Sequence, residues 1–283
     1  RKDFQFAFGG SSPGGVFYYM VGVLANLLTE KIEGLNVTNV STGAAVANAI
    51  GVAKGELHGG LTYGSLVWEL WNGVGTFEGQ GDIGKNIRGV AKAYASPHYF
   101  VALKKSGIKS ISDLEGKTVS IGQPGSGAAY NSELILDALG INVKKEHLAF
   151  ADAAYAIKEG RIDAFGQSGA PSGAITELAE TEDIIIIPFT DEEMDKLEAA
   201  SQFYYRDKLP KETYKGMTED VQMPFFSVYW VVHKDVPDDI VYEMVKTAFD
   251  PDNLKALGEG HVLWKELAED TENFEKLGPE VHP

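Results

Sequence analysis

The chain has 283 residues and a formal net charge of −16, with 44% hydrophobic and 23% charged residues. This length allows two lobes of ordinary size, and this balance is typical of a packed globular protein rather than a disordered chain. The acidic excess repels phosphate backbones, so we expect no nucleic-acid binding. Because cysteine is absent, disulfides, thiolate nucleophiles and cysteine-based metal sites are excluded.

The longest apolar stretch covers residues 16–25 and continues at Leu27 and Leu28 after Asn26. A bilayer span needs about 18 or more apolar residues, so this stretch predicts a buried helix. No charged segment followed by an apolar run precedes Phe4. We therefore expect a mature secreted chain from which any signal peptide has been removed.

The first third of the chain alternates strand and helix patterns. Periodicity predicts strands over 4–8, 35–40 and 57–62, and helices over 16–31, 44–54 and 65–71. This order implies a parallel sheet covered on both faces. Residues 87–105 are extended and aromatic-rich, and Pro97 forbids a continuous helix there. We expect this segment to cross from one lobe to the other.

After the crossing the alternation resumes, with strands predicted over 118–121, 162–165 and 184–187 and helices over 128–139, 152–159 and 172–180. Residues 225–233 form a second extended aromatic segment that suits a return crossing, and 238–283 reads as amphipathic helices packing on the first lobe. The prediction is an α/β protein of two lobes, with lobe 1 formed by residues 1–102 plus 228–283 and lobe 2 by 103–227. Hinges are expected at about residues 99–105 and 223–231.

Three strand-to-helix junctions are rich in glycine and small hydroxyl residues: 9–15, 41–44 and 122–127. At the carboxyl ends of parallel strands, such turns expose backbone N–H groups at helix N-termini, where an anion binds. The alternative is that these residues only form tight turns and helix caps. Three junctions in one repeated setting favour a carboxylate or phosphate site.

Other chemistry is poorly supported. No Gly-x-Gly-x-x-Gly follows a strand, and the Gly-Lys-Thr of residues 116–118 lacks the earlier glycine of a phosphate-binding loop. The six histidines show no metal-ligand spacing and are interpreted as ordinary surface or partly buried residues. The acidic pairs at 192–193 and 238–239 sit at expected helix starts and predict no catalytic role. We expect neither a metal nor a cofactor.

Aromatic side chains gather near the expected strand ends. Most are interpreted as core, but a tyrosine offers both a ring and a hydroxyl, which makes Tyr18, Tyr63 and Tyr94 candidates for a ligand pocket. Only four arginines occur. Among them Arg88 is the candidate for a guanidinium clamp, although backbone donors are the preferred anion ligands.

Taken together, these motifs resemble the TAXI family of substrate-binding proteins, which serve tripartite ATP-independent periplasmic (TRAP) transporters. The resemblance covers nearly the whole chain. It rests on Gly9-Gly10 and the tyrosine-containing helix after it, Ser41-Thr42-Gly43-Ala44 with Asn48, and the stretches 63–73, 112–117, 119–127 with Asn131, 160–165 and 229–232. The chain departs from the family pattern at residues 63–65, where a Gln-Ser-Asp-like run is usual, and at Ala128-Ala129, where a Thr-Glu pair is common.

The resemblance implies a type II periplasmic-binding fold of two Rossmann-like lobes joined by two hinge crossings. It implies a non-catalytic, extracytoplasmic protein, free or lipid-tethered and expected to be monomeric, that closes on a small anionic solute and delivers it to TRAP permease subunits. Glutamate, glutamine and 2-oxoglutarate are the ligand class. The alternatives are a metabolic enzyme on the same bilobal fold, for which no nucleophile or base is evident, and a ligand-sensing partner of a receptor.

The predicted ligand-binding residues come from the three junctions, the tyrosines and the strand that ends near residue 168. In the first lobe they are Gly10, Ser11, Ser12, Tyr18, Thr42, Gly43, Ala44, Asn48, Tyr63, Ser65 and Tyr94, and in the second lobe Gly125, Ser126, Gly127, Asn131, Gln167 and Ser168.

Overall fold

The computed structural model describes residues 3–283, which cluster into two compact units. Unit 1 holds the chain up to Ser12 together with Phe17–Ala95 and Ser227–Pro283, and unit 2 holds Pro13–Val16 and Ser96–Phe226. Residues 96–102 group with unit 2, whereas we expected them in lobe 1, and residue 227 groups with unit 1. Two long strands run through these boundaries, so no change in sequence pattern marks them.

Unit 1 is built on a mainly parallel sheet. Strands β1 (Phe4–Gly9), β2 (Leu35–Val40) and β3 (Gly59–Tyr63) stand in the order β2-β1-β3, and β1 is parallel to both neighbours. This confirms the parallel sheet predicted from the strand–helix alternation. Strand β10 (Val221–His233) then pairs antiparallel with β3.

The helices of unit 1 follow the predicted periodicity. Helix α1 (Val16–Lys31) has the predicted bounds and buries Met20, Leu24 and Leu28 at four-residue spacing on one face. It is followed by α2 (Ala45–Ala53), α3 (Gly64–Asn72), the 3₁₀ turn Gly75–Phe77 and α4 (Gly81–Gly84).

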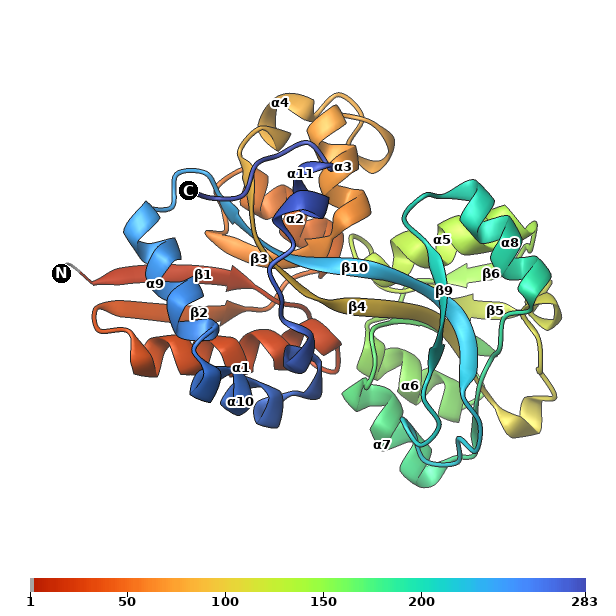
Figure 1. Ribbon diagram of the computed structural model, residues 1–283. Helices are drawn as coiled ribbons and strands as arrows, with labels where there is room; N and C mark the ends of the chain where they lie inside the picture. The colour runs from red at the N-terminus through yellow and green to blue at the C-terminus, as the bar shows by residue number, and fades with distance from the viewer. Residues whose placement is uncertain (1–2) are drawn as a thin grey trace. The chain divides into compact units, whose positions relative to one another are not determined.

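The C-terminal segment packs on unit 1, as predicted, but is not helical throughout. After α9 (Asp238–Ala248) and α10 (Pro251–Gly260) come the 3₁₀ turn Val262–Glu266 and α11 (Thr271–Glu275). Trp264 is buried and its Nε1–H donates to the Met20 carbonyl of α1 at 2.8 Å. Figure 1 draws α10 in blue beside the red α1. Two residues of this segment outside the helices, Ala268 and Val281, form isolated β-bridges to Lys92 and Gly89 of the long strand β4 (Ile87–Leu103).

Unit 2 contains a smaller mixed sheet in the order β4-β7-β5-β6. Its strands are the end of β4 (Ile87–Leu103), β5 (Thr118–Ser120), β6 (Lys144–Glu146) and β7 (Ala164–Ser168), with β8 (Ile184–Ile186) on β4 and β9 (Tyr205–Leu209) on β10. β5 is parallel to β6 and β7, whereas β7 is antiparallel to β4. β6 and β9 were not predicted, because β6 is exposed and β9 mostly so, and neither carries an alternating apolar pattern.

Helices α5 (Gly127–Leu139), α6 (Phe150–Lys158), α7 (Gly173–Thr181) and α8 (Asp191–Ala200) complete unit 2, with 3₁₀ turns at Lys104–Ser106 and Ile111–Leu114. The first turns of α5, α6 and α7 meet where Ala128, Phe150 and Ala174 form one buried cluster. Gly140 ends α5 in the left-handed conformation, as predicted.

β4 and β10 each contain residues of both units and therefore run from one unit into the other (Figure 1). This confirms that two extended crossings join the units. That the crossings act as hinges stays a prediction. No helix among residues 3–283 is long and apolar enough to cross a membrane.

Replacing each of two glycines of unit 1 by alanine should change the stability of the protein in opposite directions. Gly22 lies inside α1, and a Cβ built on it would meet only Asn39 Nδ2, at 3.5 Å. Gly22→Ala should therefore stabilise unit 1 by about 0.5–1 kcal/mol, since alanine loses less backbone entropy in a helix. Urea unfolding measures this difference.

Gly84→Ala is the contrasting variant. The added Cβ would overlap the backbone carbonyl of Leu70, which cannot rotate away. A destabilisation of about 1–3 kcal/mol is expected. Equal effects of the two substitutions would contradict the packing described here.

Candidate functional site

The loop after β1 uses its hydroxyl groups unequally. Ser11 is buried, and its Oγ accepts a hydrogen bond from the Tyr18 N–H at 3.0 Å and donates to the Ser12 carbonyl at 3.1 Å. Ser11 therefore shapes the loop. Ser12 Oγ is buried and has no hydrogen-bond partner within residues 3–283. Of the two predicted serines, Ser12 is the one whose hydroxyl is available for a ligand.

Asn48 is fully buried on α2 and ties the strand ends together. Its Nδ2 donates to the carbonyls of Gly10 at 2.8 Å, Leu61 at 2.9 Å and Gly9 at 3.2 Å. Its Oδ1 lies 2.6 Å from the Thr42 hydroxyl. Since both ends of the carboxamide are occupied by the protein, Asn48 contributes to a site by holding the two loops in place.

The first turn of α2 begins at a strained residue. Ala44, at the N-cap, has φ 78° and ψ −144°, a region that glycine adopts and other residues avoid. Its N–H donates to Thr42 Oγ1 at 3.0 Å, which holds this conformation. The loop of Thr42, Gly43 and Ala44 thus leads into a helix N-terminus whose first N–H groups have no partner within the helix. Backbone strain of this kind gathers at ligand sites.

Replacing Ala44 by glycine should relieve this strain. We expect Ala44→Gly to stabilise the protein by about 1 kcal/mol, because strain of about 1–3 kcal/mol exceeds the extra entropy of the unfolded chain. Ala45→Gly, one residue later inside the helix, should destabilise by roughly 0.5–1 kcal/mol. Urea unfolding of both variants decides, and destabilisation by both would contradict strain at residue 44.

The predicted aromatic residues divide into two groups. Tyr63 and Tyr94 are 3% and 1% exposed, and both rings meet Phe17 edge-on, with centroids 6.1 and 6.5 Å apart. Tyr18 is partly exposed and packs edge-on against Tyr19. Ser65 is buried in the first turn of α3. Phe17 is therefore the residue that brings two predicted tyrosines of unit 1 together.

The candidate clamp Arg88 is committed elsewhere. Its Nη1 donates to the carbonyls of Lys85 at 2.9 Å and Ile87 at 2.8 Å, which are its own chain neighbours. The guanidinium thus stabilises the start of β4. This arrangement leaves backbone N–H groups as the better anion ligands.

In unit 2 the corresponding junction lies between β5 and α5. Ser126 is the N-cap, and its Oγ accepts from the Ala129 N–H at 3.0 Å. Gly125 is exposed with φ 77°, while Gly127 begins the helix. This is the capping alternative considered for the sequence, and it still leaves the remaining N–H groups of the first turn oriented outward along the helix axis.

Behind this junction lies a buried polar cluster that includes the predicted Asn131 and Ser168. His98 Nδ1 lies 2.7 Å from Ser168 Oγ, and His98 Nε2 lies 3.0 Å from Ser132 Oγ. His98 is fully buried, so the interpretation of every histidine as a surface or partly buried residue was wrong. Burial lowers the pKa of His98 from 6.5 to about 3, because the charged imidazolium would lose its hydration. The imidazole is therefore neutral at physiological pH.

The end of β7 is held by a second set of hydrogen bonds. Gln167 is fully buried, and its Nε2 donates to the Ser168 carbonyl at 2.9 Å. The Tyr214 hydroxyl accepts from the Ser172 N–H at 2.8 Å and lies 2.5 Å from the Tyr99 hydroxyl, which donates to the Gly169 carbonyl. Ser172, Tyr99 and Tyr214 were not predicted. Only tertiary pairing distinguishes them from ordinary core residues.

The segment Pro13–Val16 clusters with unit 2, although it belongs to the first junction in sequence. The Gly14 carbonyl accepts a hydrogen bond from Ser172 Oγ at 3.2 Å. The first glycine-rich loop is therefore divided, with its serines in unit 1 and residues 13–16 in unit 2.

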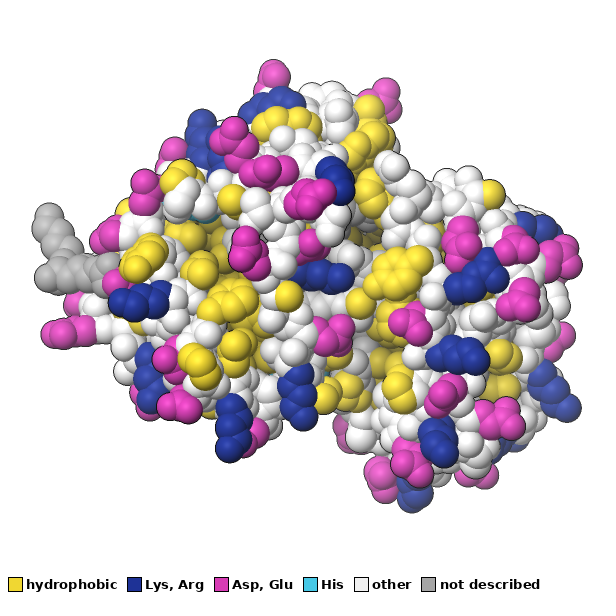
Figure 2. Space-filling model, viewed as in Figure 1, with side chains coloured by type: hydrophobic (Ala, Val, Ile, Leu, Met, Phe, Trp, Pro, Cys, Tyr) yellow, Lys and Arg dark blue, Asp and Glu magenta, His cyan; other side chains and the backbone are white. Residues whose placement is uncertain are grey.

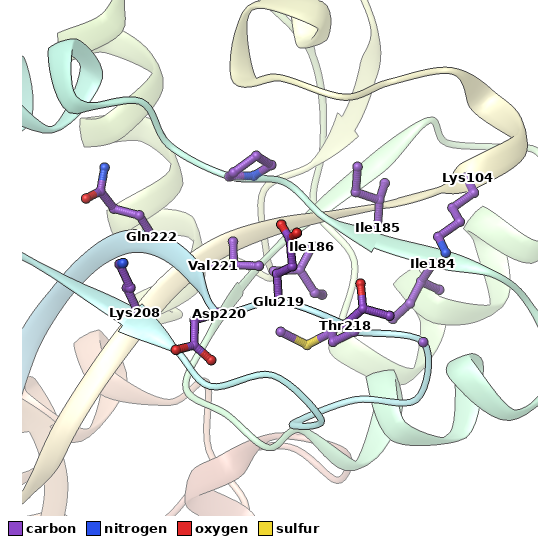
Figure 3. Close-up of a pocket in the computed structure, with 13 residues that line it drawn as sticks. Lys104, Ile184, Ile185, Ile186, Lys208, Thr218, Glu219, Asp220, Val221 and Gln222 are labelled. Atoms are coloured by element: carbon purple, nitrogen blue, oxygen red, sulfur yellow. The ribbon is translucent and has the colours of Figure 1, made fainter.

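Two open surface pockets lie away from all predicted site residues. One, of about 540 Å³, lies in unit 2 (Figure 3), where Lys104 and Lys208 lie well apart and Glu219 and Asp220 share the lining with isoleucines 184–186. The other, of about 610 Å³, lies in unit 1 near the start of β1 and the end of α1. Mixed exposed charges do not favour an anion at the first pocket.

Charge elsewhere is dispersed. On the face shown in Figure 2, Lys and Arg side chains are scattered among more numerous acidic groups, without a continuous basic patch. Within the described part of the chain, no group of three or more His, Asp and Glu residues could hold a metal ion.

The neutral imidazole of His98 predicts acid sensitivity. Between pH 6.5 and about 3 the unfolded chain binds a proton at this residue that the folded chain does not, so the free energy of unfolding falls as the pH drops. The expected slope is up to about 1.4 kcal/mol per pH unit below 6.5. Urea unfolding at about pH 7 and about pH 5 should reveal it.

His98→Asn is the matched control, because it removes this titration but keeps a polar side chain. The difference in stability between wild type and variant should shrink at the lower pH. The lowered pKa values of His58, His233 and His261 in unit 1 act on both proteins alike. A difference that does not change with pH would contradict a neutral buried His98.

Comparison with known proteins matches the chain over most of its length. The sequence profile described as the NMT1-like family matches residues 8–282. PhnD1 from Prochlorococcus marinus in complex with methylphosphonate is 13% identical, with a TM-score of 0.58 and 97% of each chain covered. The alkanesulfonate-binding protein SsuA from Xanthomonas axonopodis pv. citri bound to MOPS is 14% identical, with a TM-score of 0.56 over 98% of this chain and 90% of that one.

A third structure, the substrate-binding protein of an amino acid ABC transporter, is 16% identical, with a TM-score of 0.53 over 90% of this chain and 98% of that one. At these identities the likeness concerns the fold. The mixed α/β fold predicted from the sequence is confirmed as that of periplasmic binding proteins.

Proposed function

Because the chain belongs to the NMT1-like family, we propose that it is a non-catalytic solute-binding protein. It captures one small anionic organic molecule outside the cytoplasmic membrane and delivers it to a membrane transporter. The observation that carries the proposal is that both units lead a parallel strand into a glycine-rich or serine-rich turn at a helix N-terminus, at α2 and at α5.

The chemistry of these two turns favours an anion. Each offers backbone N–H groups at the positive end of a helix, where a carboxylate or a similar group is stabilised without a lysine or arginine. Ser12 adds a buried hydroxyl that has no partner within residues 3–283. Tyr63 and Tyr94 supply apolar ring surface around Phe17 in unit 1. Such a mixture of apolar surface and a few directed polar groups is typical of ligand sites.

Two of the similar structures hold anionic molecules. Methylphosphonate carries a phosphonate, and MOPS carries a sulfonate. Both examples support an acidic group as the part of the solute that the backbone donors recognise. The amino acid transporter component supports a carboxylate equally well.

The finer proposal rests on the resemblance in sequence. We propose that the protein is a TAXI-type component of a TRAP transporter, acting as a monomer, free or lipid-tethered, with the permease subunits as partners. Its solute is glutamate, glutamine or 2-oxoglutarate. An adjacent gene for a multi-span TRAP permease would support this assignment, and an adjacent ABC permease gene would contradict it.

A ligand screen tests the proposal. Glutamate, glutamine, 2-oxoglutarate, C4 dicarboxylates, a sulfonate and a phosphonate would be added to ligand-stripped protein and followed by thermal shift and calorimetry. A micromolar solute binds with about 8 kcal/mol, and at one hundred times its Kd it should stabilise the fold by about 2.7 kcal/mol.

An aliphatic diamine and a neutral sugar serve as controls because neither carries an anionic group. If no acidic solute stabilises the protein, the ligand class is wrong. The bound solute is then recovered and compared with the added compound by NMR. A chemically changed solute would contradict the non-catalytic role.

A further inference from the structure

The polar cluster behind the β5–α5 junction is continuous and almost completely enclosed. His98 and Ser132 are fully buried and Asn131 is 1% exposed, whereas Ser168, at the end of β7, is 9% exposed. His98 and Ser168 are cross-strand partners on β4 and β7. Ser168 is therefore the member of this group through which the cluster reaches the surface.

The orientation of Asn131 follows from two distances. One atom of its carboxamide lies 2.5 Å from the Tyr204 hydroxyl, and the other lies 3.2 Å from Ser168 Oγ. A separation of 2.5 Å suits O–H···O and is too short for N–H···O, whereas 3.2 Å suits N–H···O. Tyr204 therefore donates to Oδ1, and Nδ2 donates to Ser168.

The tautomer of His98 follows from Ser132. The neutral ring carries one N–H. The hydroxyl of Ser132 has no hydrogen-bond partner other than His98 Nε2 in the described part of the chain. If Nε2 carried the proton, the buried Ser132 hydroxyl would have no acceptor, at a cost of about 1–3 kcal/mol. The other tautomer leaves the Ser168 hydroxyl proton, instead of the Ser132 proton, without a protein acceptor, but Ser168 is 9% exposed and Ser132 is fully buried, so only the Ser168 proton can reach water or a solute oxygen. The favoured state therefore has Ser132 donating to Nε2 and the proton on Nδ1.

Ser168 Oγ then receives two hydrogen bonds, from His98 Nδ1–H and from Asn131 Nδ2. A serine hydroxyl has two acceptor positions and one proton. Both acceptor positions are filled, and residues 3–283 provide no acceptor for the proton. The hydroxyl of Ser168 is left with one remaining capacity, which is to donate.

We propose that Ser168 is a dedicated hydrogen-bond donor to an anionic oxygen of the solute, and that His98 is the positioning residue that fixes this polarity. The inference rests on the proposed function and deepens it, because it assigns a chemistry to one contact. A carboxylate, sulfonate or phosphonate oxygen accepts from Ser168. An ammonium or amide N–H at the same place finds no acceptor there, so the contact discriminates against it.

The tautomer is measured directly in ligand-free protein by ¹⁵N NMR of the imidazole, which separates a protonated from an unprotonated nitrogen. The expected result is a neutral ring protonated at Nδ1. The variant Ser132→Ala lacks the hydroxyl that donates to Nε2. The population of the tautomer protonated at Nδ1 should therefore fall in this variant. A wild-type ring protonated at Nε2 overturns the inference and leaves the proposed function untouched.

The donor role is measured by calorimetry with the acidic solute found in the screen. Ser168→Ala should weaken binding by about tenfold, since a hydrogen bond to a charged group is worth about 1.5–3 kcal/mol. Ser120→Ala is the matched control, because Ser120 is a buried serine of unit 2 whose Oγ accepts a hydrogen bond from the Leu148 N–H. This control should leave the affinity unchanged.

The two failures are distinguishable. Equal affinities of wild type and Ser168→Ala for a solute that binds overturn the inference while the proposed function stands. Absence of binding by every acidic solute overturns both. His98→Asn adds a rescue, because its Nδ2 occupies the place of Nδ1 and can still donate to Ser168, so it should retain affinity to within about threefold. A loss as large as that of Ser168→Ala would count against the assigned polarity.

Discussion

The architecture of both units depends on one constraint, which is that a buried polar group must find its hydrogen-bond partners. In unit 1 Asn48 meets it by joining the ends of β1 and β3 to α2. In unit 2 His98 meets it by joining β7 to α5 through two serines. Each side chain is fully buried and lies beside the turn that we assign to solute binding. The turns can be open and glycine-rich because these buried groups hold the elements around them.

Uncharged hydrogen-bond donors at these turns are well suited to a protein with a net charge of −16. Backbone N–H groups and a serine hydroxyl carry no formal charge, so the anion that we propose as solute would be stabilised by dipoles whose orientation the fold has already fixed. Binding of the proposed solute would then need little reorganisation of the protein. The strained backbone of Ala44 fits this view, because its conformation is imposed by Thr42 and by the packing of α2.

The apolar periodicity and the glycines at element ends were sufficient to predict most of the helices and strands. The bounds of α1 and β2 were predicted to the residue, and Gly140 ends α5 as expected. These elements are long or bounded by strong signals, so local sequence decides them. The three-residue β6 and the polar β9 carry no such signal and form only because a neighbouring strand offers backbone partners. The boundaries between units likewise fall inside strands.

The sequence by itself determined the α/β order, the glycine-rich turns and their place at helix N-termini, because these depend on residues close together in the chain. Only the tertiary structure decided what each polar group does there. Ser132 and Ser168 follow His98 by 34 and 70 positions in the chain, and the three residues meet through strand pairing and helix packing. The carboxamide of Asn48, predicted as a ligand contact, is occupied by the carbonyl groups of Gly9, Gly10 and Leu61. Hydrogen-bond polarity is a property of the assembled network, since the proton of each group goes wherever its neighbours leave an acceptor.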